Sequence, residues 1–202
     1  NKSAKLSLDN EVRLGGVLGT GIGVLVANGR HFFPYNDKLR IQGIIGYQVF
    51  SRFVVTLDYQ NQEIILTEPA HYYPPVDYTS LNLTLKDTKP YVKLQYNSAG
   101  NQNLIGYFHI DTGSSRDILL FLNSESEFKK ESLTPTEVGK GINGTINGYK
   151  SQNDPITISE LNAEAECFLV KRKFSRKEIQ NAEGSIGSGL LKNYVVVLDY
   201  VN

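Results

Sequence analysis

Short apolar runs separated by polar turns recur along most of the chain. Long segments with the 3.6-residue period of an amphipathic helix are rare. Runs of this length bounded by turn residues are typical of strands. Short helices are expected only at 47–52 and within a turn-plus-helix segment at 184–193. Strands are expected on both sides of a turn at 60–62 and at 81–85, 91–96, 104–110, 142–149, 156–161, 167–170 and 194–200, and residues 117–122 are expected to form a short strand or a turn. The chain is therefore predicted to be mainly β.

Composition narrows the classes of function. The 202 residues contain 21 Lys plus Arg and 21 Asp plus Glu, so the formal net charge is zero. Neutrality argues against nucleic acid or an anionic membrane as the main partner, and no apolar stretch is long enough to span a membrane. The single cysteine, Cys167, excludes an internal disulfide framework and is expected in the core. The three histidines lack metal-ligand spacing, so neither a metal nor another cofactor is expected.

One segment carries candidate chemistry. An apolar run that begins at Tyr107 ends on an acid and continues with small residues, namely Asp111, Thr112, Gly113, Ser114 and Ser115. Gly113 permits a tight turn or a close backbone approach. Asp111 is therefore predicted to lie at the mouth of a turn, at the end of a buried strand. An aspartate in an ordinary surface turn is the alternative, because Asp-x-Gly is common in turns.

The sequence contains an internal repeat. Residues 43–59 align with residues 184–200 at an offset of 141. Eight positions are identical: two glycines, one isoleucine, a Val-Val pair and the tripeptide Leu-Asp-Tyr. A weaker upstream match pairs Glu11-Val12 with Glu137-Val138 and Gly19-Thr20 with Gly144-Thr145, at offsets of 126 and 125. The chain is thus predicted to hold one complete copy of a unit and the C-terminal part of another.

Asp-Thr-Gly-Ser-Ser after an apolar strand, together with the late apolar-apolar-Gly turn at 44–46, resembles the aspartic peptidases, the pepsin-like and retropepsin-like group. The turn at 185–187 fits the same pattern with one departure, Ser185. The end of the repeat also resembles bacterial-type retropepsin-like domains. The resemblance implies an acid protease barrel of two related lobes: the C-terminal part of a first lobe at 1–67, a linker at 68–88 and a complete second lobe at 89–202.

The resemblance also implies roles for individual residues. Asp111 would be one half of a catalytic pair of aspartates. Thr112 would help to lock the two active-site loops together, and Ser114 would hydrogen-bond to the Asp111 carboxylate. A substrate-covering hairpin is expected between 142 and 158 with Tyr149 near its tip, although an ordinary exposed turn aromatic is the alternative. One turn is expected to pack behind each of the two loops. The first turn contains Ile45 and Gly46, and the second contains Ile186 and Gly187.

The second aspartate is not found in this sequence. The position equivalent to Asp111 in the first copy, 141 or 125 residues earlier, would lie before Asn1. No other Asp-Thr-Gly or Asp-Ser-Gly tripeptide occurs in the sequence. It is therefore expected upstream of Asn1 or from a second copy of the chain.

The resemblance thus implies an aspartic endopeptidase that acts on extended peptides or unfolded protein, and it alone implies an extracytoplasmic location. An inactive peptidase-like peptide- or protein-binding module is the first alternative. A β-rich interaction domain with a chance motif is the second.

Overall fold

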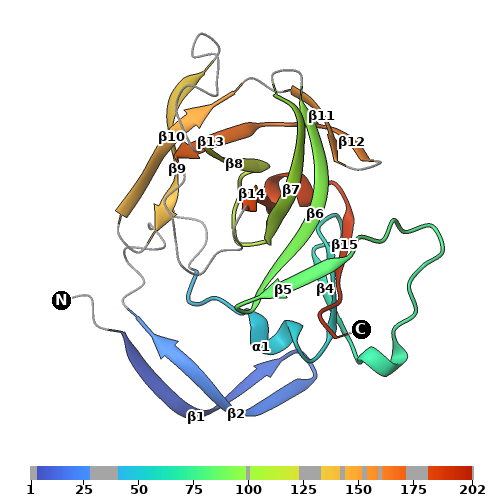
Figure 1. Ribbon diagram of the computed structural model, residues 1–202. Coiled ribbons are helices and arrows are strands. Elements are labelled where there is room, and N and C mark those ends of the chain that lie inside the picture. Colours follow the sequence, from blue (N-terminus) through green and yellow to red (C-terminus); the bar gives the residue numbers. More distant parts are fainter. Residues whose placement is uncertain are drawn as a thin grey trace. The chain divides into compact units, whose positions relative to one another are not determined.

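The computed structural model describes residues 4–27, 41–98, 101–122, 133–141, 144–151, 154–158, 161–171 and 182–201. Most of these residues lie in strands and the helices are short, which confirms the predicted β class (Figure 1). The chain divides into two compact units. One is formed by residues 1–44 and 140–144, and the other by residues 45–139 and 145–202.

The smaller unit contains a long hairpin. β1 (Lys5–Leu14) and β2 (Val17–Val26) pair antiparallel around a turn that begins at Gly15, whose φ of 55° lies in the left-handed region that glycine tolerates. The register of pairing shifts on either side of Asn10. Asn10 Nδ2 donates to Ser7 O at 3.0 Å and to Ile22 O at 2.8 Å. A side-chain amide therefore satisfies backbone carbonyls where the ladder is irregular.

A ten-stranded sheet is the main feature of the larger unit in the described part of the chain. Its strands follow the order β12-β11-β6-β7-β14-β8-β13-β10-β9, and β5 pairs additionally with β6. The sheet curls into a half-barrel (Figure 1). The strands are β5 (Leu83–Lys86), β6 (Lys89–Ser98), β7 (Asn101–Asp111), β8 (Ile118–Leu122), β9 (Thr134–Gly141), β10 (Gly144–Lys150), β11 (Asp154–Ile158), β12 (Leu161–Ala165), β13 (Cys167–Lys171) and β14 (Ala182–Gly187).

Inward-facing side chains of this sheet form one hydrophobic core. Tyr96 and Phe108 lie in it with ring centroids 6.0 Å apart. Cys167 is buried there, as expected, and its Sγ lies 2.8 Å from the Tyr96 hydroxyl oxygen. Because each large apolar side chain contributes about 1.5–3 kcal/mol when it is fully buried, this core is a main source of stability for the larger unit.

A second sheet places one strand from each copy of the repeat side by side. β3 (Val54–Asp58) follows the short helix α1 (Tyr47–Phe50) and pairs antiparallel with both β4 (Glu63–Thr67) and β15 (Val195–Leu198). β3 and β15 are equivalent parts of the repeat. Thr56 lies opposite Val197, and 197 − 56 = 141, so these two paired residues are repeat equivalents. The two strands therefore pair about a local twofold axis that passes through this residue pair.

The identical Leu-Asp-Tyr segments share a turn hydrogen bond and a hydrophobic cluster in both copies. Asp58 Oδ1 accepts the N–H of Gln60 at 3.1 Å, and Asp199 Oδ1 accepts the N–H of Val201, the equivalent donor, at 3.0 Å. Both leucines are buried in one cluster and both tyrosines pack against it: Leu57, Leu198, Tyr59 and Tyr200. The sequence repeat is thus also a repeat of local structure.

Two predicted elements differ from the structure. Residues 184–187, predicted as a turn, are the end of strand β14. Their side chains are mostly small, and the sequence signal of a strand comes mainly from bulky apolar residues, so the strand was not predicted. The hairpin expected between 142 and 158 does not form among the described residues, since β10 neighbours β9 and β13 whereas β11 neighbours β6 and β12. The predicted linker at 68–88 contains a 3-10 helix, η2 (Pro69–His71), and strand β5.

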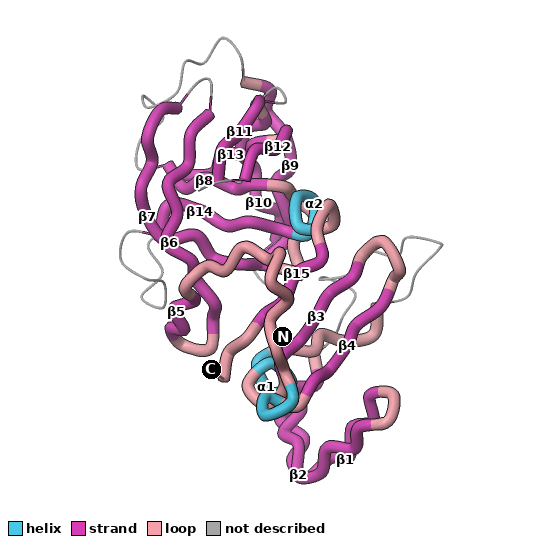
Figure 2. Tube along the Cα trace, turned by 90° about the vertical axis from the view of Figure 1, so that its right-hand side faces the viewer, coloured by secondary structure: helices cyan, strands magenta, loops and turns pink. Residues whose placement is uncertain are grey.

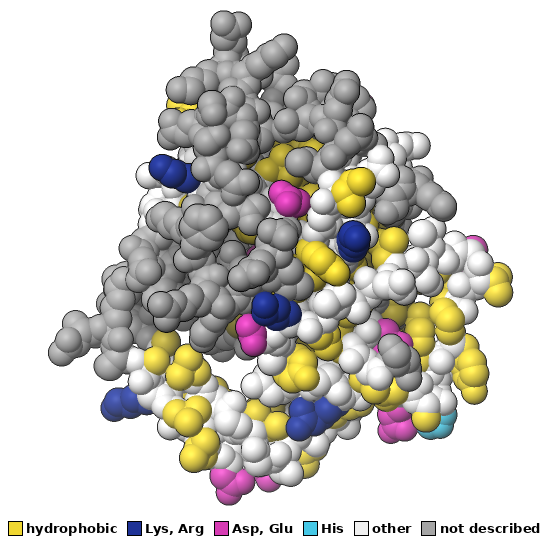
Figure 3. All heavy atoms as spheres, in the orientation of Figure 1, with side chains coloured by type: hydrophobic (Ala, Val, Ile, Leu, Met, Phe, Trp, Pro, Cys, Tyr) yellow, Lys and Arg dark blue, Asp and Glu magenta, His cyan; other side chains and the backbone are white. Residues whose placement is uncertain are grey.

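The surface carries charges of both signs. On the face drawn in Figure 3, Lys and Arg side chains and Asp and Glu side chains are scattered among hydrophobic and uncharged groups. Within the described residues, no helix has the length and hydrophobicity needed to cross a membrane.

Candidate active site

Asp111 is the last residue of β7 and is half-buried. The chain turns directly after it, and Ser114 N–H closes the turn by donating to the backbone oxygen of Asp111 at 3.0 Å. Gly113 N–H donates to Asp111 Oδ1 at 3.2 Å. The carboxylate is therefore oriented by the backbone of its own loop.

Strand β14 lies between the two strands that this loop connects. It pairs parallel with β7, where Gly187 lies opposite Asp111, and antiparallel with β8, where Ile186 lies opposite Ile118. The loop at 112–117 must therefore cross the end of β14 to join β7 to β8. Helix α2 (Ser188–Leu191) continues from β14 at this end (Figure 2).

Glycine is required where the loop crosses the strand. A Cβ on Gly187 would lie 2.2 Å from Arg116 O and 2.7 Å from Ser114 O, well inside van der Waals contact. Gly187 N–H donates to Asp117 O at 2.9 Å, and Ser114 O accepts both the N–H and the Oγ–H of Ser188, each at 2.7 Å. Direct backbone packing and hydrogen bonds therefore hold the loop on the end of β14.

The residue before Asp111 contacts the hydrophobic cluster of the three-stranded sheet. Ile110 packs against the core of the ten-stranded sheet and also against the cluster of the three-stranded sheet. That cluster contains Leu57 and Leu198, each next to a member of the Thr56–Val197 pair in its strand. Ile110 therefore joins the strand end that carries Asp111 to the cluster around the paired strands β3 and β15.

His109 is a neighbour of Asp111 that sequence reasoning missed. The two side chains lie on one face of β7, because side chains alternate along a strand. The His109 ring lies 5.3 Å from the Tyr91 ring on β6. The pKa of His109 is lowered, mainly by burial and also by the charge of Lys89. The charge of Asp111 acts in the opposite direction and raises that pKa. The two-residue spacing within a strand was the signal that could have placed His109 in the site.

The corresponding turn in the first copy of the repeat has different surroundings. Ile45 is 56% exposed, whereas its equivalent Ile186 is 4% exposed. A Cβ on Gly46 would have no described atom within 4 Å, in contrast to Gly187. Two equivalent packing turns were predicted, and in the described part of the chain only the second one lies behind an aspartate loop.

Three other predicted site residues have defined positions. Thr112 is half-buried in the turn, and a second loop to which it could bond is not among the described residues. Ser114 Oγ accepts the N–H of Arg116 at 3.3 Å, while the Asp111 carboxylate accepts from Gly113 instead. Tyr149 lies in β10 opposite Leu169 and packs against the core, so the expectation that it lies near the tip of a 142–158 hairpin is wrong.

No protein-family model matches the chain, and no curated protein matches it. In the residues that the structure describes, no group of three or more His, Cys, Asp or Glu side chains is arranged to hold a metal ion. The site is thus defined by its own geometry: a half-buried carboxylate at a strand end, on a fixed loop, next to a residue that packs against the cluster of the three-stranded sheet.

Proposed function

We propose that the chain is part of an aspartic endopeptidase with a pepsin- or retropepsin-like fold, in which Asp111 is one of two catalytic carboxylates. The observation that carries the proposal is the position of Asp111, on a loop fixed across β14 and directly after Ile110, which packs against the cluster around the twofold-paired strands β3 and β15. A carboxylate close to a twofold axis lies close to its symmetry mate, and a catalytic carboxylate pair needs this arrangement.

The proposed chemistry requires two carboxylates that share one proton. Two such groups a few ångströms apart cannot both ionise, so the pair titrates as a unit. The ionised member takes a proton from a bound water, and the protonated member donates to the oxygen of the scissile carbonyl. The water then attacks the carbonyl carbon. The substrate would be an extended peptide, which can pair with strand edges through its backbone.

The second carboxylate would come from a strand–loop–strand segment packed on residues 43–46. In the second copy, the equivalent residues 184–187 are enclosed by β7 and β8, and the aspartate loop crosses their end. In the first copy, Ile44 and Ile45 are exposed among the described residues. The repeat therefore favours an equivalent segment at this place. Residues upstream of Asn1 are the preferred source, because half of a first copy is already present, and a second copy of the chain is the other source.

Cleavage of an unfolded protein tests the proposal. The protein, with any residues that precede Asn1, should cleave an unfolded substrate best in acid. Asp111→Ala should slow cleavage by about 10²–10⁴-fold, the usual contribution of a general acid or base, and a statine-type inhibitor should block it. Peptides released over time are measured by mass spectrometry.

Asp199→Asn is the matched control, because Asp199 accepts a hydrogen bond in the turn after β15 and lies outside the proposed site. Its cleavage rate should stay close to that of the unmodified protein. Unchanged cleavage by Asp111→Ala would refute the role of Asp111. Peptide binding without cleavage by the unmodified protein would instead support an inactive binding module.

A further inference from the structure

The side chain of Arg116 reaches from the Asp111 loop to strand β9. Its Nε donates to Val138 O at 3.0 Å, and its Nη2 donates to Glu137 O at 2.7 Å. The guanidinium carbon lies 4.4 Å from the centroid of the Phe168 ring, which is buried. A planar guanidinium can hold two acceptors in fixed directions while it stacks on an aromatic face. These contacts therefore define both the position and the orientation of the side chain.

The backbone of Arg116 is fixed as well. Its carbonyl oxygen occupies the space beside Gly187 that a Cβ would need, and its N–H donates to Ser114 Oγ at 3.3 Å. Arg116 thus joins the aspartate loop, the end of β14 and strand β9. Sequence analysis assigned it no role, because its acceptors are backbone carbonyls 22 and 21 residues away, which no sequence motif reveals.

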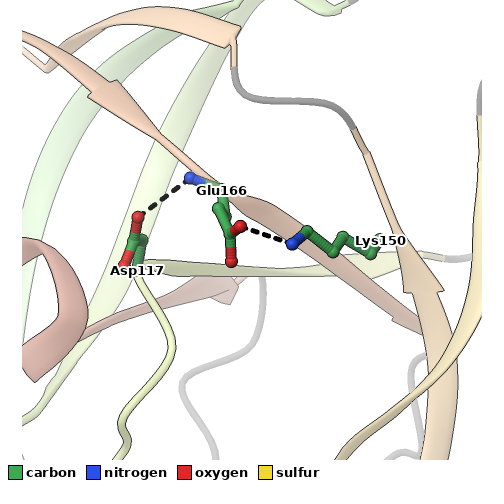
Figure 4. Close-up of polar contacts among 3 residues, drawn as sticks. All are labelled: Asp117, Lys150 and Glu166. Carbon is green, nitrogen blue, oxygen red and sulfur yellow. Dashed lines mark hydrogen bonds and ion pairs between the residues drawn. The ribbon is translucent and has the colours of Figure 1, made fainter.

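A second set of contacts ties β10 to the same loop. Asp117 Oδ2 accepts the N–H of Glu166 at 2.9 Å, and Glu166 O accepts the N–H of Ile118 at 3.3 Å. The Glu166 carboxylate forms an ion pair with Lys150 on β10 (Figure 4). This ion pair is partly exposed, and such pairs contribute little on their own. Arg116, with two acceptors and a buried aromatic ring, is therefore the stronger link.

We propose that Arg116 is a positioning residue that couples strand β9 to the Asp111 loop. The proposal rests on the proposed function, because the coupling affects catalysis only if Asp111 reacts with substrate. Without the guanidinium, the loop and β9 lose their shared anchor and can move independently. A shift of about 1 Å in a catalytic group can cost about 10²-fold in rate, so this coupling would help to hold Asp111 in its reactive position.

Hydrogen exchange of the chain tests the coupling without any assay of activity. Arg116→Ala should raise exchange rates about tenfold or more in peptides that cover 112–118 and also in peptides that cover 134–141. Peptides from β3 and β4 should keep their rates. Arg116→Lys, which keeps the charge and loses the planar fork, should show the same pattern to a smaller extent. Added methylguanidinium should restore protection to Arg116→Ala, whereas methylammonium should not.

Arg52→Ala is the matched control, because Arg52 also donates to a backbone carbonyl, Gln48 O at 2.7 Å, but at an exposed position in another part of the chain. It should leave both sets of peptides unchanged. A rise confined to 134–141, or a uniform rise over the whole chain, would overturn the coupling.

In protein that cleaves peptides, Arg116→Lys should lower kcat about tenfold or more and change KM by less than about threefold, because Arg116 acts through the loop. An unchanged kcat would refute the positioning role. If Asp111→Ala also cleaves normally, the proposed function fails separately, and hydrogen exchange still decides whether Arg116 couples β9 to the loop.

Discussion

At the scale of single residues, the pair His109 and Asp111 offers a direct probe of the site. Both side chains lie on one face of β7, and the charge of Asp111 opposes the burial that lowers the pKa of His109. The imidazole therefore reports whether a negative charge is present at position 111. This is useful because the histidine can be observed without substrate and without a second aspartate.

Asp111→Asn should lower the pKa of His109 further, because the substitution removes the contribution that raises it. The shift is measured by NMR titration of the imidazole Cε1–H signal. Asp199→Asn, on a different strand end, should leave that pKa unchanged. A His109 pKa that stays constant or rises in Asp111→Asn would show that the carboxylate does not face the histidine.

The lowered pKa of His109 also determines how its contribution to folding stability changes with pH. In the unfolded chain His109 takes up its proton near pH 6.5, whereas in the folded protein it stays neutral to lower pH. The unfolded state therefore binds more protons in this interval, and the contribution of His109 to stability falls as pH drops below about 6.5. The decrease ends once pH is below the folded pKa.

At the scale of elements, the pairing of β3 with β15 explains why Leu-Asp-Tyr occurs twice. Each leucine enters one shared cluster, and each aspartate accepts the backbone N–H two residues later. An antiparallel pair has a local twofold axis, so two equivalent strands can meet in equivalent ways. The repeat therefore serves a single small core to which both copies contribute.

Leu57→Ala and Leu198→Ala should each lower the free energy of unfolding by about 2–4 kcal/mol, the usual cost of removing a buried leucine side chain. The two losses should be similar, and the double variant should depart from their sum because both leucines belong to one cluster. Urea unfolding followed by circular dichroism measures the changes.

Ile64→Ala is the control within the same sheet, since Ile64 is largely exposed on β4. It should cost less than about 1 kcal/mol. A loss below 1 kcal/mol for either leucine would contradict a core shared by the two copies.

At the scale of the whole molecule, two equivalent glycines have different surroundings. Gly187 has a φ of −109°, which any residue can adopt, so close backbone approach is the reason for a glycine there. Gly46 has open space around it among the described residues. If a strand–loop–strand segment packs on residues 43–46, as proposed, Gly46 would need the same absence of a side chain.

Gly187→Ala should destabilise the chain by about 1–3 kcal/mol, because the new methyl group overlaps backbone that cannot move freely. Gly46→Ala should change the stability of this chain by less than about 0.5 kcal/mol. In protein that carries the second aspartate segment, Gly46→Ala should cost about as much as Gly187→Ala. Thermal and urea unfolding of both forms provide the comparison. A neutral Gly46→Ala in the form that carries the second aspartate segment would argue against a segment packed at this turn.

Local features of the fold and site were predictable. The β class and most strands follow from short apolar runs between turn residues, and the loop after Asp111 follows from the adjacent Thr112 and Gly113. The role of β14 was not predictable, because a strand of small residues has no apolar pattern of its own. Its identity depends on the neighbours β7 and β8, which the sequence does not specify locally.

The prediction for Tyr149 was wrong for a related reason. A hairpin is the default expectation for two strands that follow one another, but β10 and β11 pair with different neighbours. Pairing is chosen by the fit of whole strands to a shared core and by register. Arg116 and His109 were missed because their significance depends on atoms that only the folded chain brings near them.

By itself, the sequence determined most of the strands, the acid at the end of one of them and the repeat with its offset of 141 residues, because propensity, turn chemistry and self-similarity are properties of neighbouring residues. The tertiary structure decided that β14 runs between β7 and β8, that Thr56 faces Val197 on a local twofold axis, and that Arg116 holds the loop to β9. These features join residues far apart in sequence, and packing and backbone hydrogen bonding select among the many pairings that local preferences allow.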